Sequence, residues 1–199
     1  TARVRAYELR DPSRGNLPAV DPGSHLKIPM RLPTGVMAVR QYSIASNPLR
    51  RDVYEIAVQR EDGGSGGSRA VHDTYQVGTR IRLDLPMNHF GLHDDERPAV
   101  LIAGGIGITA IKSMAQALYA RGGNFSLHYA GRSQADMAFS ERLKQKFRTQ
   151  ASIYGAAEGN RLDVHRILSA APKDAIIYVC GPDRLNRAVK NIAVKLDIP

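Results

Sequence analysis

Residues 98–109 read Pro-Ala-Val-Leu-Ile-Ala-Gly-Gly-Ile-Gly-Ile-Thr, an apolar run that breaks into glycines and then opens a helical pattern. A strand, a glycine turn and a helix in this order form an anion site, because free backbone amides and the positive end of the helix dipole meet there. Residues 105–110 also fit the dinucleotide-binding fingerprint, with alanine in its last position. The stretch predicts a phosphate-binding turn, and a tight turn needed only for packing is the alternative.

Downstream of this stretch, continuous apolar segments alternate with helical patterns. Further strands are predicted at 124–130, 151–154 and 175–180, and an amphipathic helix at 185–196. Such alternation is typical of a parallel sheet with helices on both faces. Gly131 and Arg132 stand where the fingerprint expects an acidic ribose partner, so the pattern keeps the phosphate turn but lacks the usual acidic residue.

Upstream, the chain is built from short segments in which polar and apolar residues alternate. Strands are predicted at 3–10, 25–30, 36–39, 53–58 and 80–85. Proline and glycine turns separate them, as in an antiparallel barrel or sandwich. A short helix is predicted at 70–74 after the glycine–serine run 63–68, for which a flexible linker is the alternative. Because the alternation has already begun at residue 3, we expect a preceding strand to be missing.

The change of pattern divides the chain near residue 96. Residues 1–96 are predicted to form an antiparallel domain and residues 97–199 an α/β domain with a parallel sheet. At 199 residues the chain is long enough to bury a substantial core in either arrangement. We detect no repeat that crosses the boundary.

The composition narrows the classes of function. The chain is 43% hydrophobic and 24% charged, as in an ordinary soluble protein, and no apolar run approaches the length of a membrane span. One cysteine, Cys180, excludes an internal disulfide and supplies too few thiolates for an iron–sulfur cluster. A cytoplasmic location is the simplest interpretation.

The net charge of +9 raises the question of a polyanionic partner. Arginines are scattered and no block of lysine and arginine occurs, so we expect anionic cofactors and an acidic protein partner instead of nucleic acid. His89 and His93 have the spacing of a metal pair, but Pro86 and Gly91 argue against the helix that this spacing requires. No metal site is predicted.

A second motif, Arg40-Gln41-Tyr42-Ser43, brings a cation, an aromatic face and a hydroxyl together within four residues. A guanidinium offers planar, bidentate recognition of phosphate. With the glycine turn this makes two anion sites, one of them beside an aromatic platform. The sequence therefore predicts two phosphate-bearing cofactors held against each other.

Four motifs occur in the order and spacing found in the ferredoxin-reductase-like flavoproteins. They are Arg40-x-Tyr42-Ser43, the glycine–serine loop ending at Ser68, Gly104-Gly105-x-Gly107-Ile108-Thr109 and Cys180-Gly181-Pro182. Within that family the chain resembles phthalate dioxygenase reductase and the vanillate demethylase reductases, and Pro86-x-Asn88-x-Phe90-x-Leu92 and Ala57-Val58-x-Arg60 strengthen the match. The resemblance covers essentially the whole chain.

The resemblance implies an antiparallel flavin-binding β-barrel followed by a parallel-sheet domain that binds a nicotinamide nucleotide. It implies the reductase component of an aromatic-ring oxygenase or demethylase, in which hydride passes from NADH to FMN and single electrons then pass to a 2Fe–2S ferredoxin and a terminal oxygenase. The family usually carries that ferredoxin as a third domain, which would begin after Pro199, so we expect it to be truncated or a separate protein. A non-catalytic nucleotide-binding or docking module is the alternative.

The resemblance also assigns the flavin contacts. Arg40 would pair with the flavin phosphate, Tyr42 would lie against the isoalloxazine ring, and Ser43 would hydrogen-bond near the nitrogen that accepts hydride; Gln41 lies between them. Backbone groups of Ala57, Val58 and Gln59 would contact the flavin edge, and the loop Ser65-Gly66-Gly67-Ser68 would hold the phosphate. Close relatives use FMN, whereas much of the wider superfamily uses FAD. Ser65 and Gln59 replace an arginine and a lysine of the family, and both changes remove positive charge.

On the nucleotide side, the resemblance implies that Gly104, Gly105 and Gly107 admit the pyrophosphate and that Thr109 touches the flavin. Ala110 replaces the family's usual proline. Cys180, followed by Gly181 and Pro182, would border the nicotinamide, with a small buried residue as the alternative reading of Cys180. Arg132 is placed near the adenine and Asp136 near the ribose, and NADH is predicted over NADPH. Tyr42, Ser43 and Cys180 are the residues expected beside the reacting atoms.

Overall fold

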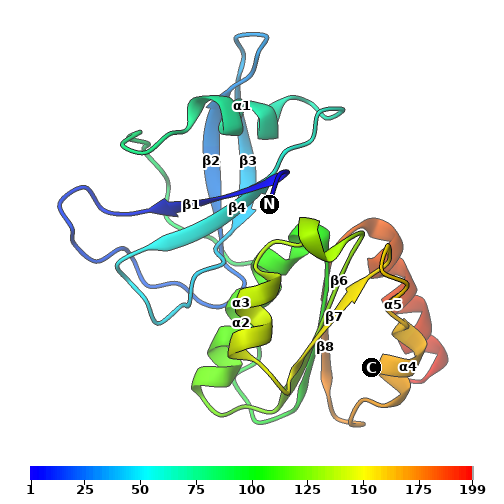
Figure 1. Cartoon of the computed structure of the whole chain (residues 1–199). Helices are drawn as coiled ribbons and strands as arrows, with labels where there is room; N and C mark the ends of the chain where they lie inside the picture. The colour runs from blue at the N-terminus through cyan, green and yellow to red at the C-terminus, as the bar shows by residue number, and fades with distance from the viewer. Residues whose placement is uncertain (199) are drawn as a thin grey trace.

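The computed structural model describes residues 1–198, in which antiparallel strands precede a parallel sheet (Figure 1). The first part consists of β1 (Val4–Leu9), β2 (His25–Arg31), β3 (Met37–Ser43), β4 (Tyr54–Gln59) and helix α1 (Gly67–Thr74). Strand β1 pairs with β4 and β2 pairs with β3, both antiparallel, which confirms the predicted pairing direction. Alternate side chains of these strands and one face of α1 share a core that includes Leu26, Ile28, Ile56, Val58 and Val71.

The prediction of a strand at 80–85 is wrong. Ile81 and Leu83 are half-buried and pack against the core of the antiparallel part, so the alternation of burial is present. However, the segment forms no ladder within residues 1–198, and the nearest pairing is a single bridge between Met87 and His25. Alternation reports which side of a segment is covered, whereas a strand also needs a neighbour in hydrogen-bonding position.

The second part is a four-stranded parallel sheet with helices on both faces, as predicted. Its elements are β5 (Ala99–Gly104), α2 (Ile108–Ala120), β6 (Phe125–Gly131), α3 (Ser140–Lys146), β7 (Ala151–Gly155), α4 (Val164–Ser169), β8 (Ile176–Cys180) and α5 (Asp183–Lys195), with short 3₁₀ turns at Gly105–Gly107 and Gln134–Asp136. The spatial order is β7-β6-β5-β8. From β5 the chain proceeds outwards through β6 to β7 and then returns to place β8 on the other side of β5. In such sheets ligands bind outside the carboxyl ends of the strands at the place where the strand order reverses, here between β5 and β8.

The two faces of the sheet are covered by different helices. Figure 1 shows α2 and α3 on one side and α4 and α5 on the other. Leu101, Met114 and Phe147 belong to the first core, and Ile102 and Val189 belong to the second. The near-continuous burial of β5, the central strand, explains why its sequence is apolar without alternation.

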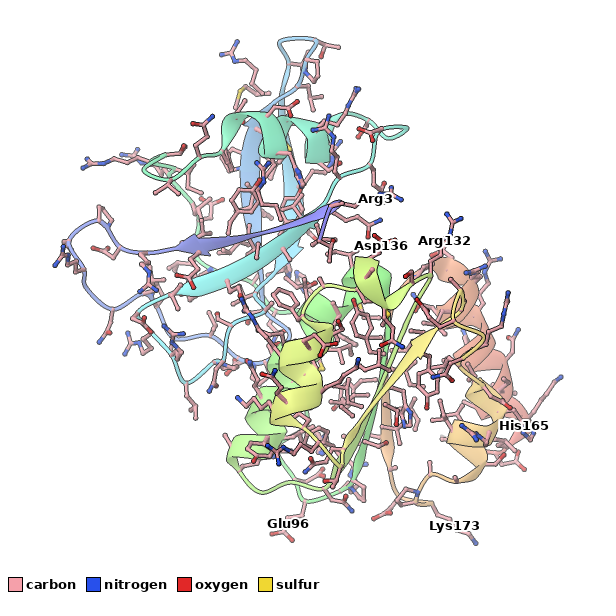
Figure 2. All side chains as sticks on the ribbon, viewed as in Figure 1. Arg3, Glu96, Arg132, Asp136, His165 and Lys173 are labelled. Atoms are coloured by element: carbon pink, nitrogen blue, oxygen red, sulfur yellow. The ribbon has the colours of Figure 1, made fainter. Side chains whose placement is uncertain are left out.

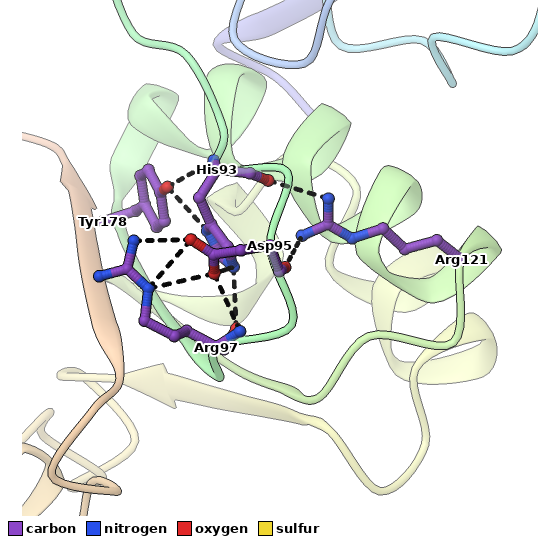
Figure 3. Close-up of polar contacts among 5 residues, drawn as sticks. All are labelled: His93, Asp95, Arg97, Arg121 and Tyr178. Carbon is purple, nitrogen blue, oxygen red and sulfur yellow. Dashed lines mark hydrogen bonds and ion pairs between the residues drawn. The ribbon is translucent and has the colours of Figure 1, made fainter.

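The segment between the two parts is fixed to the second part by a polar network (Figure 3). The imidazole of His93 lies between the Tyr178 hydroxyl, 2.9 Å from Nδ1, and the carbonyl of Arg97, 2.8 Å from Nε2. Asp95 accepts from the Arg97 guanidinium at 2.7 Å, and Arg121 donates to the carbonyl of His93 at 2.9 Å. The two histidines that the sequence placed in a loop are in a loop, and His93 has a structural partner there.

Residues 1–198 contain neither a candidate membrane span nor a cluster of metal-ligating side chains. No helix among them has the length and apolar character needed to cross a bilayer. Nor do three or more His, Cys, Asp or Glu side chains in this part of the chain come together in a way that would hold a metal ion.

The free energy of unfolding should decrease as the pH is lowered from 6.5 to about 4, because His128 is buried in its neutral form. This residue of β6 lies between the hydroxyls of Tyr154 and Ser126, and burial, with Arg166 nearby, lowers its pKa from 6.5 to about 4. The unfolded chain takes up this proton near pH 6.5 and the folded chain does not, so the stability is fully present above pH 6.5 and is lost as the pH falls towards 4. Allowing for partial exposure, we expect a loss of about 2 kcal/mol.

Urea unfolding of the parent and of His128→Gln at several pH values measures this loss. His25 also has a pKa lowered by burial and contributes in the same direction, so the difference between the two pH profiles isolates His128. A His128→Gln variant with the same slope as the parent between pH 6.5 and 4 would contradict the assignment.

Candidate functional site

The glycine turn joins the end of β5 to the start of α2 at the reversal point of the sheet. Gly105 has φ +54°, which a side chain would strain, and a Cβ on Gly107 would lie 2.1 Å from the carbonyl oxygen of Cys180. A Cβ on Gly104 would lie 2.7 Å from Cδ2 of Leu185. The turn can therefore sit against the end of β8 only because these residues are glycines.

Helix α2 begins without any side chain that caps its amino end. Thr109, in its first turn, is buried, and its hydroxyl donates to the carbonyl of Ile106 at 2.9 Å. The first amides of a helix have no partner within the helix. The 3₁₀ turn Gly105–Gly107 runs directly into α2, and the Ile108 amide donates to the carbonyls of Gly105 and Ile106, so the amides of the glycine turn itself are the backbone donors at the predicted phosphate position.

A cavity of about 640 Å³ opens at the carboxyl ends of the four parallel strands. Its lining includes Gly104 and Gly105, Gly131 and Arg132, Tyr154, Asn160 and Arg161, and Pro182 and Arg184. Three of these are arginines, and the lining contains no carboxylate. The charge, the glycines and the place in the fold suit a long anionic ligand such as a dinucleotide.

Cys180 ends β8 and is half-buried. Burial raises the pKa of its thiol, so at neutral pH it is a thiol and not a thiolate. Its carbonyl packs against Gly107, and Gly181, the next residue, packs against Gly104. The Cys180-Gly181-Pro182 motif thus contacts the glycine turn directly.

The Arg40 motif lies on β3, and its guanidinium reaches the amino end of α1. Arg40 donates to the hydroxyl of Ser65 at 2.9 Å and to the carbonyl of Val39 at 2.9 Å. Helix α1 starts at Gly67 after Gly66, which has φ +86°, and no side chain caps it. The structure therefore brings together a cation, a hydroxyl and a free helix terminus, which are the elements of a phosphate site.

Ser68 lies in the first turn of α1, and its hydroxyl accepts from the amide of Glu61 at 3.0 Å. The glycine–serine run is therefore a helix start held against the preceding turn, which decides against the flexible-linker interpretation. The adjacent Arg69 was missed by the sequence reasoning. Its Nε is buried and has no hydrogen-bond partner among the described residues. Its Nη2 lies close to Gly66, 3.8 Å from where a Cβ on that glycine would be.

Tyr42 and Ser43 follow Arg40 on the same strand and are half-buried. Burial raises the pKa of the Tyr42 phenol, so the ring is neutral at physiological pH. Ser43 pairs across the ladder with His25, which places the two side chains on one face. His25 is 8% exposed and its Nε2 has no partner within residues 1–198, so it is a second residue of this site that the sequence did not indicate.

The residues expected on the flavin side and those expected on the nucleotide side meet where β4 packs against the glycine turn. A cavity of about 200 Å³ lies at this junction and is lined by Gln59 of β4, Gly105 and Ile106 of the turn, and Arg132 and Asp136. Ala57 and Val58 precede Gln59 and are buried. In Figure 2 Asp136 lies beside Arg3, and Arg132 lies nearer to α5.

Arg132 lines both cavities, whereas Asp136 lines only the smaller one. Within residues 1–198 neither side chain makes a hydrogen bond that orients it, although the loop around them is held by Glu158, which accepts from Ser133 at 2.8 Å. Both residues are exposed. Their positions leave both available to a bound nucleotide.

The chain is similar to one family model and to several curated proteins that are longer than it. The family of the oxidoreductase NAD-binding domain matches residues 101–191. A phenoxybenzoate dioxygenase subunit beta from Ectopseudomonas oleovorans is 39% identical over 197 residues, which cover 98% of this chain and 60% of that protein. A vanillate O-demethylase oxidoreductase from Acinetobacter baylyi is 36% identical over 183 residues, covering 92% and 56%.

Among solved structures, phthalate dioxygenase reductase matches with a TM-score of 0.87 and 30% identity, over 97% of this chain and 60% of that one. Its structure is described as modular, for electron transfer from pyridine nucleotides to a 2Fe–2S centre. The chain spans less than two thirds of the length of each of these three proteins.

Proposed function

The chain belongs to the ferredoxin-reductase-like flavoproteins, in the group of oxygenase and demethylase reductases, and from this membership we propose that it passes reducing equivalents from NADH to a bound flavin. The observation that carries the proposal is the packing of β4 against the glycine turn. It puts the residues suited to a flavin and those suited to a nicotinamide nucleotide on two sides of one junction.

The residues at the start of α1 fit a flavin phosphate. Arg40 is bonded to Ser65, Arg69 keeps an unpartnered Nε, and Gly66 and Gly67 leave the backbone accessible. We propose FMN as the flavin, because one phosphate matches this single cluster of donors. Ser65 stands where the family has an arginine, so that positive charge is absent here. In this proposal Arg69 supplies a positive charge in its place.

The protein's contribution to the reaction is to bind and orient. When bound, a flavin would supply acceptance of hydride from NADH and release of single electrons, so the redox chemistry would belong to the cofactors. In this proposal Tyr42 covers the flavin ring, the Ser43 hydroxyl hydrogen-bonds to the ring, and backbone groups of Ala57 to Gln59 hold its edge. Thr109 touches the flavin from the nucleotide side, the thiol of Cys180 borders the nicotinamide, and the pyrophosphate of the dinucleotide lies on the glycine turn.

We propose a division of labour near residue 96, with residues 1–96 holding the flavin and residues 97–199 the nucleotide. The electron acceptor is proposed to be a 2Fe–2S ferredoxin, as part of a longer chain or as a separate protein, which passes electrons to a terminal oxygenase. The relatives named as dioxygenase and demethylase components support this proposal. A cytoplasmic location is part of the proposal.

Reconstitution tests the function directly. The protein, loaded with FMN and freed of excess flavin, should show flavin absorbance that NADH bleaches, and it should reduce ferricyanide. Reduction of cytochrome c should stay slow until a 2Fe–2S ferredoxin is added. A protein that binds nucleotides but neither retains FMN or FAD nor oxidises NADH would instead be the non-catalytic docking module.

NADH is expected to be preferred over NADPH. A carboxylate at the ribose accepts hydroxyl hydrogen bonds and repels a 2′-phosphate. Asp136 is the carboxylate available beside Arg132. Steady-state kinetics should give a higher kcat/KM for NADH, and Asp136→Asn should raise kcat/KM for NADPH. An NADPH preference in the parent that disappears in Arg132→Ala would contradict the proposal and assign Arg132 to the 2′-phosphate.

A further inference from the structure

A buried ion pair, extended by the exposed Arg142, joins the two parts of the chain away from the proposed cofactor contacts. Glu55 of β4 and Lys112 of α2 are 8% and 5% exposed. Lys112 Nζ donates to Glu55 Oε2 at 2.6 Å, and Arg142 of α3 donates to Oε1 at 2.8 Å. One carboxylate of the antiparallel part is thus held by two cations of the parallel-sheet part.

The same lysine holds a second segment of the antiparallel part. Its Nζ also donates to the carbonyl of Ala45 at 2.6 Å. Ala45 lies two residues after Ser43, and Glu55 lies two residues before Ala57. The Ala45 amide in turn donates to the carbonyl of Glu55 at 2.6 Å, so the lysine contacts two segments that are bonded to each other.

On the other side of the junction, Lys112 is three residues after Thr109 and therefore lies on the same face of α2. Helix α2 is a 13-residue element that starts directly after the glycine turn. Because a helix moves as a rigid body, the position of Lys112 sets the position of Thr109 and the turn. The ion pair therefore links the segments proposed to hold the flavin with the helix that carries Thr109 and follows the turn proposed to hold the nucleotide.

Phe139 provides an independent sign that this geometry is imposed. Its φ is +63°, in the left-handed region that bulky residues rarely occupy. The ring centroid lies 4.7 Å from Lys112 Nζ and 5.6 Å from Arg142 Cζ. The strained backbone places an aromatic face over both cations, and such strain persists where the surroundings determine the conformation.

We propose that Lys112, with Glu55 and Arg142, is a positioning residue that sets the approach of the nicotinamide to the flavin. This inference rests on the proposed function. A buried ion pair adds little net stability compared with an apolar pair of the same size, but it restricts the arrangement of the segments that carry the charges. The residues touch neither cofactor in the proposed arrangement, so they act through Thr109, the turn and the two flavin-side segments.

The variants are Lys112→Met, Glu55→Gln and the double variant, compared with Arg10→Gln. Arg10 is exposed and pairs with Glu8 and Asp52, so it controls for the loss of an ion pair outside the junction. FMN and NADH dissociation constants are measured separately, and stopped-flow absorbance gives the rate of flavin reduction and the long-wavelength band of the stacked flavin and nicotinamide. Amide exchange of the unloaded protein reports on residues 45–57 and 108–115.

We expect each single variant to keep both dissociation constants, to lose the stacking band and to reduce flavin about 10- to 100-fold more slowly, because small misplacements of reacting groups are costly. The double variant should be no slower than the single ones, and amide exchange should rise in both segments. Arg10→Gln should match the parent. If Lys112→Met does not fold, Lys112→Arg replaces it in the experiment. This variant keeps the charge and should show a smaller decrease in the rate of flavin reduction.

Folded variants that reduce flavin at the parent rate would overturn the inference. So would a loss of rate that only follows weaker binding of FMN or NADH. These outcomes are distinct from failure of the proposed function, in which the parent itself would not be reduced by NADH.

Discussion

Arg40→Ala is expected to raise the dissociation constant of FMN by about 10- to 100-fold. The guanidinium lies at the free amino end of α1, bonded to the hydroxyl of Ser65, where a phosphate would meet a cation and backbone amides together. Loss of a charge-assisted hydrogen bond costs about 1.5–3 kcal/mol, which corresponds to one to two decades in affinity. Titration of the unloaded protein, followed by quenching of flavin fluorescence, gives the constant.

Two further variants make the experiment specific. Arg148→Ala removes the same charge from an exposed position after α3 and should leave the constant unchanged. Arg69→Ala removes the neighbouring cation, whose Nε is unpartnered within residues 1–198. It should weaken FMN binding, and its effect should add to that of Arg40→Ala. An Arg40→Ala protein that binds FMN like the parent would show that Arg40 is not part of the site.

Gly107→Ala is expected to destabilise the parallel-sheet part and to abolish measurable NADH binding. A Cβ at this position would lie 2.1 Å from the oxygen and 2.5 Å from the carbon of the Cys180 carbonyl, and backbone atoms cannot move aside as a flexible side chain can. Overpacking of this kind costs about 1–3 kcal/mol or more. The turn must also separate from the end of β8, which opens the site built there.

Chemical unfolding and NADH titration measure the two effects. Gly91→Ala is the matched control, because a Cβ there meets nothing within 4 Å and the residue has no positive φ. It should leave both stability and NADH affinity unchanged. Should Gly107→Ala retain parent stability and bind NADH normally, the close packing of the turn against Cys180 would not hold in solution.

Local patterns predicted the parallel-sheet part well. The apolar run of β5, the glycines after it and the start of α2 are consecutive, so residues 98–109 contain nearly all the information needed for that unit. For β3 the prediction was too short, because the strand expected at 36–39 continues to Ser43 and so carries Arg40, Tyr42 and Ser43 as well. Each of these features depends on neighbours within about one turn or one strand.

The features that the sequence did not predict depend on distant partners. Residues 80–85 alternate like a strand, but whether a strand forms depends on a ladder partner from elsewhere in the chain. Glu55 and Lys112 lie 57 positions apart, and the sequence does not show that these single charges, each in a largely apolar segment, pair with each other. The unpartnered nitrogens of His25 and Arg69 are likewise visible only when the fold shows what surrounds them.

The network around His93 bears on how the molecule can be divided. His93, Asp95 and Arg97 are bonded to one another and to Tyr178 and Arg121, and all of these bonds fall on the parallel-sheet side (Figure 3). A nucleotide-binding fragment that started at residue 97 would leave the Tyr178 hydroxyl and the Arg121 guanidinium without these partners. A fragment that starts before His93 would keep all of these hydrogen bonds. The nucleotide-binding unit that can be exchanged between reductases therefore begins earlier than the change of sequence pattern near residue 96 indicates.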